Sequence, residues 1–167
     1  MGVFFSGTEI LQIAVAIEEN GFAFYETLML NATRPDLKAS YDYLAGEEKV
    51  HKQVFLKLME AAGKDYTVEN YPGEQAAYLK SLADSVVFTP DKMKKMAQQM
   101  PDDIKALDTA LGIEKDTVVF FSEVRNMLRE QDRHTVDSII DQEKSHIKHI
   151  LDLKKMLHKE SVQEYGH

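Results

Sequence analysis

The chain has 167 residues, 44% of them hydrophobic, so one domain with a substantial core is expected. Its net charge of −8, from 28 acidic and 20 basic residues, argues against a nucleic-acid partner, because binding phosphates requires a basic face. The absence of cysteine excludes disulfides and thiolate metal sites. No apolar stretch approaches the roughly 18 residues of a membrane span and no signal peptide is evident, so we expect no membrane partner and a cytoplasmic location.

The first long helix is predicted over residues 8–30, where apolar side chains recur every three or four positions. One member of this apolar stripe is a carboxylate, Glu18. Gly21 lies one turn later, and a mid-helix glycine costs about 1 kcal/mol relative to alanine. We therefore expect a close approach beside Glu18 to require it. The helix ends before a turn that contains Pro35.

The second helix, predicted over residues 36–62, carries Glu48 and His51 within the sequence Gly-Glu-Glu-Lys-Val-His. Two residues three apart on a helix project from one face, and here they replace members of an apolar stripe. One such pair commonly occurs by chance. A buried, unpaired carboxylate is costly, however, so Glu48 needs a cation or dense hydrogen bonding. The turn lies midway between Glu18 and Glu48, so the two carboxylates should lie level across the hairpin.

Residues 63–103 are the least regular part of the chain and hold three of the four prolines. Within them, short helices are predicted at 74–84 and from Thr89 to about Met100, where Thr89 caps the helix and Pro90 takes its first position. About forty residues with little core pattern are typical of a long crossover in a helical bundle.

The third helix, predicted over residues 104–129, again carries a carboxylate on its apolar stripe, Glu114. A polar turn is expected at residues 130–134, followed by a fourth helix over 135–159. The fourth helix contains a second Glu-x-x-His sequence. Its carboxylate, Glu143, should lie nearly level with Glu114.

The two halves of the chain repeat each other. The sequences around Glu18 and Glu114 align at an offset of 96, and the two Glu-x-x-His sequences align at 95. A duplicated helical hairpin explains both offsets and brings two half-sites to one central axis.

Four carboxylates and two imidazoles are therefore predicted to meet in the core, and four negative charges would balance two divalent cations. One Glu from each of two helices and Glu-x-x-His from the other two is the di-metal carboxylate arrangement of ferritin-like bundles. We predict a single all-α domain, a ferritin-like four-helix bundle of two duplicated hairpins. Mixed oxygen and nitrogen ligands favour two iron ions, with manganese or zinc as alternatives. The predicted metal ligands are Glu18, Glu48, His51, Glu114, Glu143 and His146.

These motifs resemble those of the rubrerythrin family, in which a Glu is followed about thirty residues later by Glu-x-x-His, twice. The resemblance covers roughly residues 8–62 and 103–158. The ligand assignment that it implies is Glu48 and Glu143 bridging the metals, Glu18 with His51 completing one site, and Glu114 with His146 completing the other.

Three further residues are candidates for positioning the ligands. By the resemblance, Tyr25 would hydrogen-bond a ligand carboxylate, although an ordinary core aromatic would have the same pattern. Glu47 and Gln142 could each accept from the ring N–H of the opposite histidine, or be surface helix residues. The remaining histidines are expected to face solvent: His134, His149, His158 and His167.

Two departures from the family bear on function. Thr117 stands where rubrerythrins usually carry an added carboxylate, and the sequence lacks the four cysteines of a rubredoxin-like domain. We expect an oxidoreductase that reacts with peroxide or O2 at a binuclear iron centre, with an external electron donor protein. The alternatives are an iron-binding or ferroxidase-type module without an organic substrate, and a structural metal-binding bundle. We expect a homodimer, whereas mineral storage would need a hollow shell.

Overall fold

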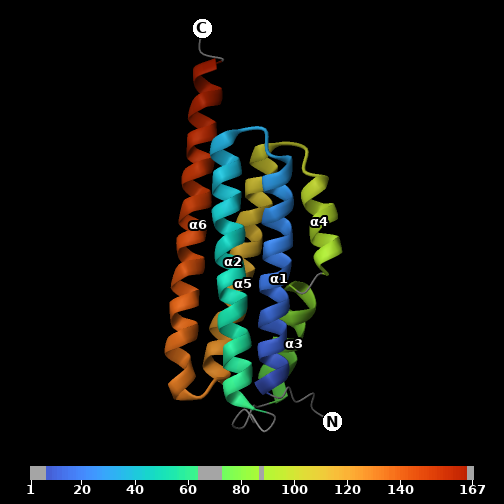
Figure 1. The fold of residues 1–167 in the computed structure, drawn as a ribbon, viewed down its shortest axis with the longest axis vertical. Helices are drawn as coiled ribbons and strands as arrows, with labels where there is room; N and C mark the ends of the chain where they lie inside the picture. Colours follow the sequence, from blue (N-terminus) through green and yellow to red (C-terminus); the bar gives the residue numbers. More distant parts are fainter. Residues whose placement is uncertain (1–6, 64–72, 87–88, 165–167) are drawn as a thin grey trace.

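The computed structural model describes residues 7–63, 73–86 and 89–164 of the chain (Figure 1). Within these ranges the secondary structure is entirely helical, which confirms the predicted all-α class. The helices are α1 (Gly7–Asn31), α2 (Pro35–Ala62), α3 (Gly73–Val86), α4 (Pro90–Gln98), α5 (Asp103–Met127) and α6 (Glu130–Glu164).

Two antiparallel hairpins form the four-helix bundle. Helix α1 packs on α2, and α5 packs on α6. The long axes of these four helices are roughly aligned with one another (Figure 1). Pro35 begins α2 at a position where its missing N–H breaks no hydrogen bond. Asp102 caps α5, because its carboxylate accepts from the backbone N–H of Lys105 at 2.7 Å. Pro35 therefore marks where the first hairpin reverses, and Asp102 marks where α5 begins after the crossover.

The two short helices of the crossover lie along the side of the bundle (Figure 1). Helix α4 packs on α1, where Met93 and Ala97 are buried, and α3 packs on α5. The Thr89 hydroxyl accepts from the N–H of Lys92 at the start of α4. The crossover thus covers α1 and α5 and leaves α2 and α6 without an added layer among the described residues.

The polar turn expected at residues 130–134 is wrong, because α6 already begins at Glu130. The chain instead reverses at Leu128, whose backbone is extended and whose side chain is buried. Arg133 donates to the Leu128 carbonyl at 3.0 Å, which satisfies an acceptor at the end of α5. The polar residues that suggested a turn form the largely exposed first turn of a helix, where acidic side chains such as Asp132 are favoured.

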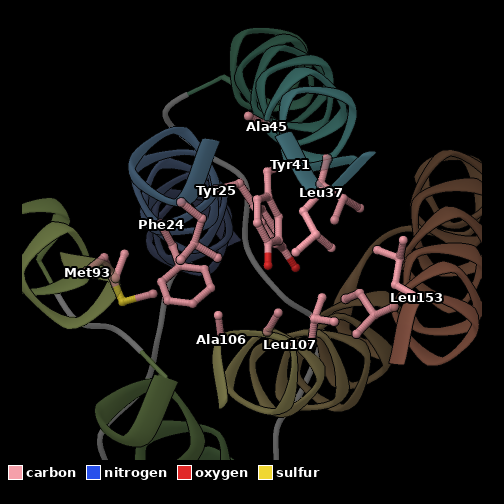
Figure 2. Close-up of a cluster of buried hydrophobic side chains, with 14 of the residues drawn as sticks. Phe24, Tyr25, Leu37, Tyr41, Ala45, Met93, Ala106, Leu107 and Leu153 are labelled. Atoms are coloured by element: carbon pink, nitrogen blue, oxygen red, sulfur yellow. The ribbon is translucent and has the colours of Figure 1, made fainter. Parts of the chain in front are cut away.

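Apolar side chains form two core clusters, one toward each end of the bundle. The first includes Phe55 and Phe121, whose ring centroids are 4.9 Å apart. The second, shown in Figure 2, joins Phe24, Leu107 and side chains from α2, α4 and α6. Along each long helix the polar core positions fall between the residues of these two clusters. The bundle therefore holds its polar side chains in the middle, with apolar packing on both sides.

No helix in the described part of the chain is both long enough and apolar enough to cross a lipid bilayer.

Candidate metal centre

Six polar side chains meet at the middle of the bundle, between the two apolar clusters. None of them is more than 3% exposed. Helices α1 and α5 contribute one carboxylate each, and α2 and α6 contribute a carboxylate and an imidazole each, one helical turn apart. The structure thus brings together all six residues predicted as ligands, which are Glu18, Glu48, His51, Glu114, Glu143 and His146.

The six side chains form two overlapping groups of four. One group is Glu18, Glu48, His51 and Glu143, and the other is Glu48, Glu114, Glu143 and His146; within each, one ligand atom per residue lies within 4.8 Å of the others. Only Glu48 and Glu143 belong to both groups. Two adjacent cation positions with two shared carboxylates are therefore compatible with this geometry.

The two histidines turn the same ring atom toward the carboxylates. His51 Nδ1 lies 2.8 Å from Glu143 Oε1 and 3.7 Å from Glu18 Oε2. His146 Nδ1 lies 3.0 Å from Glu143 Oε2 and 3.8 Å from Glu114 Oε2. The two rings are stacked, with centroids 5.6 Å apart and planes 21° from parallel. Each Nδ1 is therefore the atom that faces the shared site, and each Nε2 faces outward.

The outward Nε2 atoms meet different partners. His51 Nε2 lies 2.6 Å from the side-chain carbonyl of Gln142, so a proton on Nε2 can be donated to that oxygen. His146 Nε2 is 4.0 Å from Glu47 Oε2, too far for a hydrogen bond. Donation from Nε2 leaves Nδ1 free to bind a cation. In the described geometry only the His51 half has this second partner in place.

Tyr25 lies directly beside one of the carboxylates. Its hydroxyl donates a hydrogen bond to Glu114 Oε1, and its ring is buried edge-on against Phe24. Burial, together with the charge of Glu114, raises the pKa of Tyr25 well above its ordinary value, so the hydroxyl keeps its proton. Tyr25 is therefore placed to hold the orientation of Glu114.

The four buried carboxylates differ in protonation when no cation is present. Burial raises the pKa of Glu18 and Glu48 well above the ordinary range and that of Glu114 to about 7. Burial alone would also raise the pKa of Glu143, but hydrogen bonds from the two histidines outweigh it and lower that pKa to about 2. Negative charge therefore concentrates on Glu143.

Both imidazoles are protonated at neutral pH when no cation is bound. Burial alone would lower both pKa values, but hydrogen bonds to carboxylates raise that of His51 to about 9 and that of His146 to about 10. Since metal ligands must be deprotonated, a cation that binds here has to displace these protons. Without a metal ion, protons on the two histidines compensate the negative charge of the cluster.

Several buried polar atoms of the cluster lack a hydrogen-bond partner, which tests whether a metal fits. A buried carboxylate without donors is costly, and a cation bound within the ligand group that contains Glu18 would compensate its charge. Oxygen and nitrogen donors of this kind suit iron or manganese, and zinc can use the same set. The atoms without a partner include Glu18 Oε1 and Oε2 and His146 Nε2.

Comparison with known proteins supports this interpretation of the site. A sequence model of the Rubrerythrin family matches residues 9–154, which is most of the chain. The chain belongs to the rubrerythrin family. Comparison with curated proteins gives no significant match.

A solved structure shares the fold of this rubrerythrin family member. It is a protein of Thermotoga maritima described as a ferritin-like diiron-carboxylate protein, with 24% sequence identity and a TM-score of 0.67. The match covers 93% of this chain and 98% of that chain. At this identity the likeness concerns the fold, and it confirms the predicted ferritin-like bundle.

Two positions lie three residues after a predicted ligand, Gly21 on α1 and Thr117 on α5. Thr117 is buried at 3% exposure, so a neutral side chain lies where the sequence resemblance implied an added carboxylate. The close approach that Gly21 was expected to allow beside Glu18 is confirmed, and the side chain that approaches is Glu48, from α2. Adjacent turns of α1 therefore contact different parts of the site.

The histidines outside the cluster are not all solvent-facing. His134 and His158 are exposed, whereas His149 is partly buried, so the expectation for His149 is wrong. The cause is Tyr43, whose ring lies edge-on to both His149 and His146, at centroid distances of 5.7 Å and 6.1 Å. His167 lies outside the described residues.

Sequence reasoning missed Tyr43 as a neighbour of the site. Tyr43 is 49% exposed. It precedes Glu47 by one helical turn on α2, and His146 precedes His149 by nearly one turn on α6. Spacing along one helix does not show which residue of another helix it faces, so no signal in the sequence identified Tyr43 as a neighbour of His146. Tyr43 therefore connects the surface of α2 with a predicted metal ligand.

A hollow of about 310 Å³ between α2 and α6 reaches the outer side of His51. It mixes apolar side chains with hydroxyls, two imidazoles and the Gln142 amide. Its lining residues are Val50, His51, Val54, His134, Thr135, Ser138, Ile139 and Gln142.

Replacing Glu18 by Gln should have opposite effects on the metal-free and metal-loaded protein. The metal-free protein should become more stable, by about 1–3 kcal/mol at neutral pH, because burial raises the pKa of Glu18 and folding must then protonate this carboxyl, a cost that a neutral amide does not have. The increase in Tm on adding Mn²⁺ should shrink, because a ligand is lost. Thermal unfolding with and without Mn²⁺ measures both effects.

The matched control for that experiment is Glu19→Gln, one position along α1. Glu19 is partly exposed and pairs with Lys52 at 2.7 Å, so its replacement should change stability by less than about 0.5 kcal/mol. An unchanged Mn²⁺ response in Glu18→Gln would contradict the predicted ligand role.

Replacing Gln142 by Leu should weaken metal binding by about 10–100-fold, because His51 loses the acceptor that orients its ring. Glu47→Leu should have a smaller effect, since its oxygen is 4.0 Å from His146 Nε2. Competition of each variant with a metal chelator for Co²⁺ measures the difference. Equal losses in the two variants would show that the described asymmetry does not matter for binding.

Proposed function

We propose that this chain is a di-iron oxidoreductase that uses peroxide or O2 and takes electrons from an external donor protein. The observation that supports it is the pair of overlapping ligand groups that share Glu48 and Glu143. In this proposal Glu18 and His51 complete one iron site, and Glu114 and His146 complete the other. Manganese or zinc could occupy the same ligands.

The chain's own residues have distinct roles in this proposal. Two bound ferrous ions would supply the two electrons that reduce peroxide to water, and the donor would restore them. Tyr25 holds Glu114 by a hydrogen bond, and Gln142 orients His51. The apolar clusters on both sides keep water away, which strengthens each electrostatic interaction in the site.

We propose that the oxidant enters by the hollow between α2 and α6. That hollow touches His51 and Gln142, and α3 and α4 cover other helices of the bundle. The mixed apolar and hydroxyl lining suits a small uncharged molecule such as hydrogen peroxide or O2. The same side would admit electrons, because Tyr43 is half exposed and its ring lies against that of His146.

The 167 residues contain no cysteine and hence no four-thiolate iron site, so the electron donor is proposed to be external to them. A homodimer is proposed as the native assembly. Sizing of the iron-loaded protein would identify a hollow shell, which would favour iron storage over the oxidoreductase.

Loading the metal-free protein with Fe²⁺ under nitrogen tests the proposal. We expect two iron ions per chain, and oxidation by hydrogen peroxide at least ten times faster than that of free Fe²⁺ at the same concentration, measured by stopped-flow absorbance. The expected rate follows from placing both electrons in one preorganised site. Two tightly held ions that peroxide oxidises no faster than free Fe²⁺ would favour the structural alternative, and fewer than two would overturn the di-iron assignment.

Filling the hollow tests the proposed route of entry. Ser138→Trp should slow oxidation by peroxide about tenfold while iron content stays at two per chain, because Ser138 lines the hollow but contacts no predicted ligand in the described hydrogen bonds. Ser145→Trp is the matched control, since Ser145 is an exposed serine of the same helix outside the hollow. Equal rates in the two variants would rule out this route.

A further inference from the structure

Gly21 occupies a position in the middle of α1 at which a side chain has no room. A Cβ built on Gly21 would lie 2.6 Å from Glu48 Oε2 and 2.9 Å from its Cδ. Non-bonded carbons and oxygens do not approach this closely without displacement, because contact distances are about 3.5 Å. The Glu48 carboxylate therefore fills the space that any other residue at position 21 would use.

The conformation of the backbone does not explain this glycine. Among the described glycines only Gly63 has a positive φ, of 69°, which is the region where glycine is favoured. Gly21 is helical, and a glycine inside a helix destabilises it relative to alanine. Two other helical glycines, Gly46 and Gly112, have nothing within 4 Å of their Cβ positions. The contact with Glu48 is thus specific to Gly21.

We infer that Gly21 is a positioning residue that sets the place of the Glu48 carboxylate. The missing side chain lets the α2 carboxylate reach the backbone of α1, and the helix then limits its movement on that side. Glu48 is one of two carboxylates shared by both ligand groups, so its displacement would disturb both metal positions. This inference rests on the proposed di-metal function for its consequence in metal binding.

The two halves of the internal repeat carry different residues at the position of Gly21. Gly21 follows Glu18 by three residues, and Thr117 follows Glu114 by three. The first is a glycine against Glu48, and the second is a buried threonine. The chain therefore reserves space for a bridging carboxylate at the α1 position and fills the corresponding α5 position with a side chain.

Two alanine variants test the inference in the metal-bound protein. Gly112→Ala, at an exposed and open helical position, should raise the Tm by about 2–4 °C and bind two Co²⁺ ions with the wild-type visible spectrum. Gly21→Ala should bind Co²⁺ at least tenfold more weakly or with a changed spectrum, because the added methyl displaces Glu48. Wild-type affinity and spectrum in Gly21→Ala would overturn the inference.

A metal-free comparison separates this inference from the proposed function. In the wild-type background Gly21→Ala should lower the Tm, whereas in a Glu48→Ala background it should raise the Tm, since the carboxylate is gone and alanine favours the helix. The same sign in both backgrounds would overturn the inference. If the signs differ but the wild-type protein binds no metal, the positioning of Glu48 stands and the proposed di-iron function fails.

Discussion

The structure depends on one electrostatic constraint: four carboxylates lie side by side in the middle of a helical bundle, away from water. Glu18 and Glu143 are fully buried, and both oxygens of Glu18 lack a hydrogen-bond donor. Like charges in a medium of low polarity repel strongly, so such a cluster needs protons or cations to persist. Without metal, the two histidines carry protons and Glu143 carries the negative charge. A bundle built for stability alone would place leucine at these positions.

Apolar packing on both sides of the four carboxylates offsets the cost of burying them. The two core clusters lie on either side of the polar layer, so each long helix is anchored above and below the site. The crossover helices add packing against α1 and α5, while α2 and α6 keep an accessible seam near His51. Packing on one side and a hollow on the other is the distribution that the proposed entry of a small molecule would require.

Duplication supplied two similar half-sites, but the structure does not treat them equally. His51 has Gln142 as an outer partner at hydrogen-bond distance, whereas the corresponding Glu47 oxygen is 4.0 Å from His146. Tyr25 bonds Glu114 on the opposite hairpin, and Gly21 lies against Glu48 within its own hairpin. These differences give each metal position its own surroundings. They are a physical route by which two ions in one centre could come to differ in affinity or potential.

Periodicity in the sequence was sufficient to place six polar residues on inward stripes, because a buried carboxylate interrupts an otherwise apolar pattern. The doubled Glu-x-x-His spacing and the position of each turn then made their meeting predictable. The start of α6 was not predictable from polarity, because the exposed first turn of a helix and a surface turn use the same residues. The crossover's packing on α1 also followed no visible pattern in the sequence.

The sequence by itself determined the helical class, the repeat and the set of side chains that meet, since these depend on spacing along one helix at a time. Tertiary structure decided which carboxylate Gly21 contacts, which nitrogen of each histidine faces the site, and that Tyr43 reaches His146. These features depend on the rotation and axial offset of one helix against another. Shifts of about 1 Å change such contacts while leaving every pattern in the sequence the same, because ridges and grooves tolerate a range of packing angles.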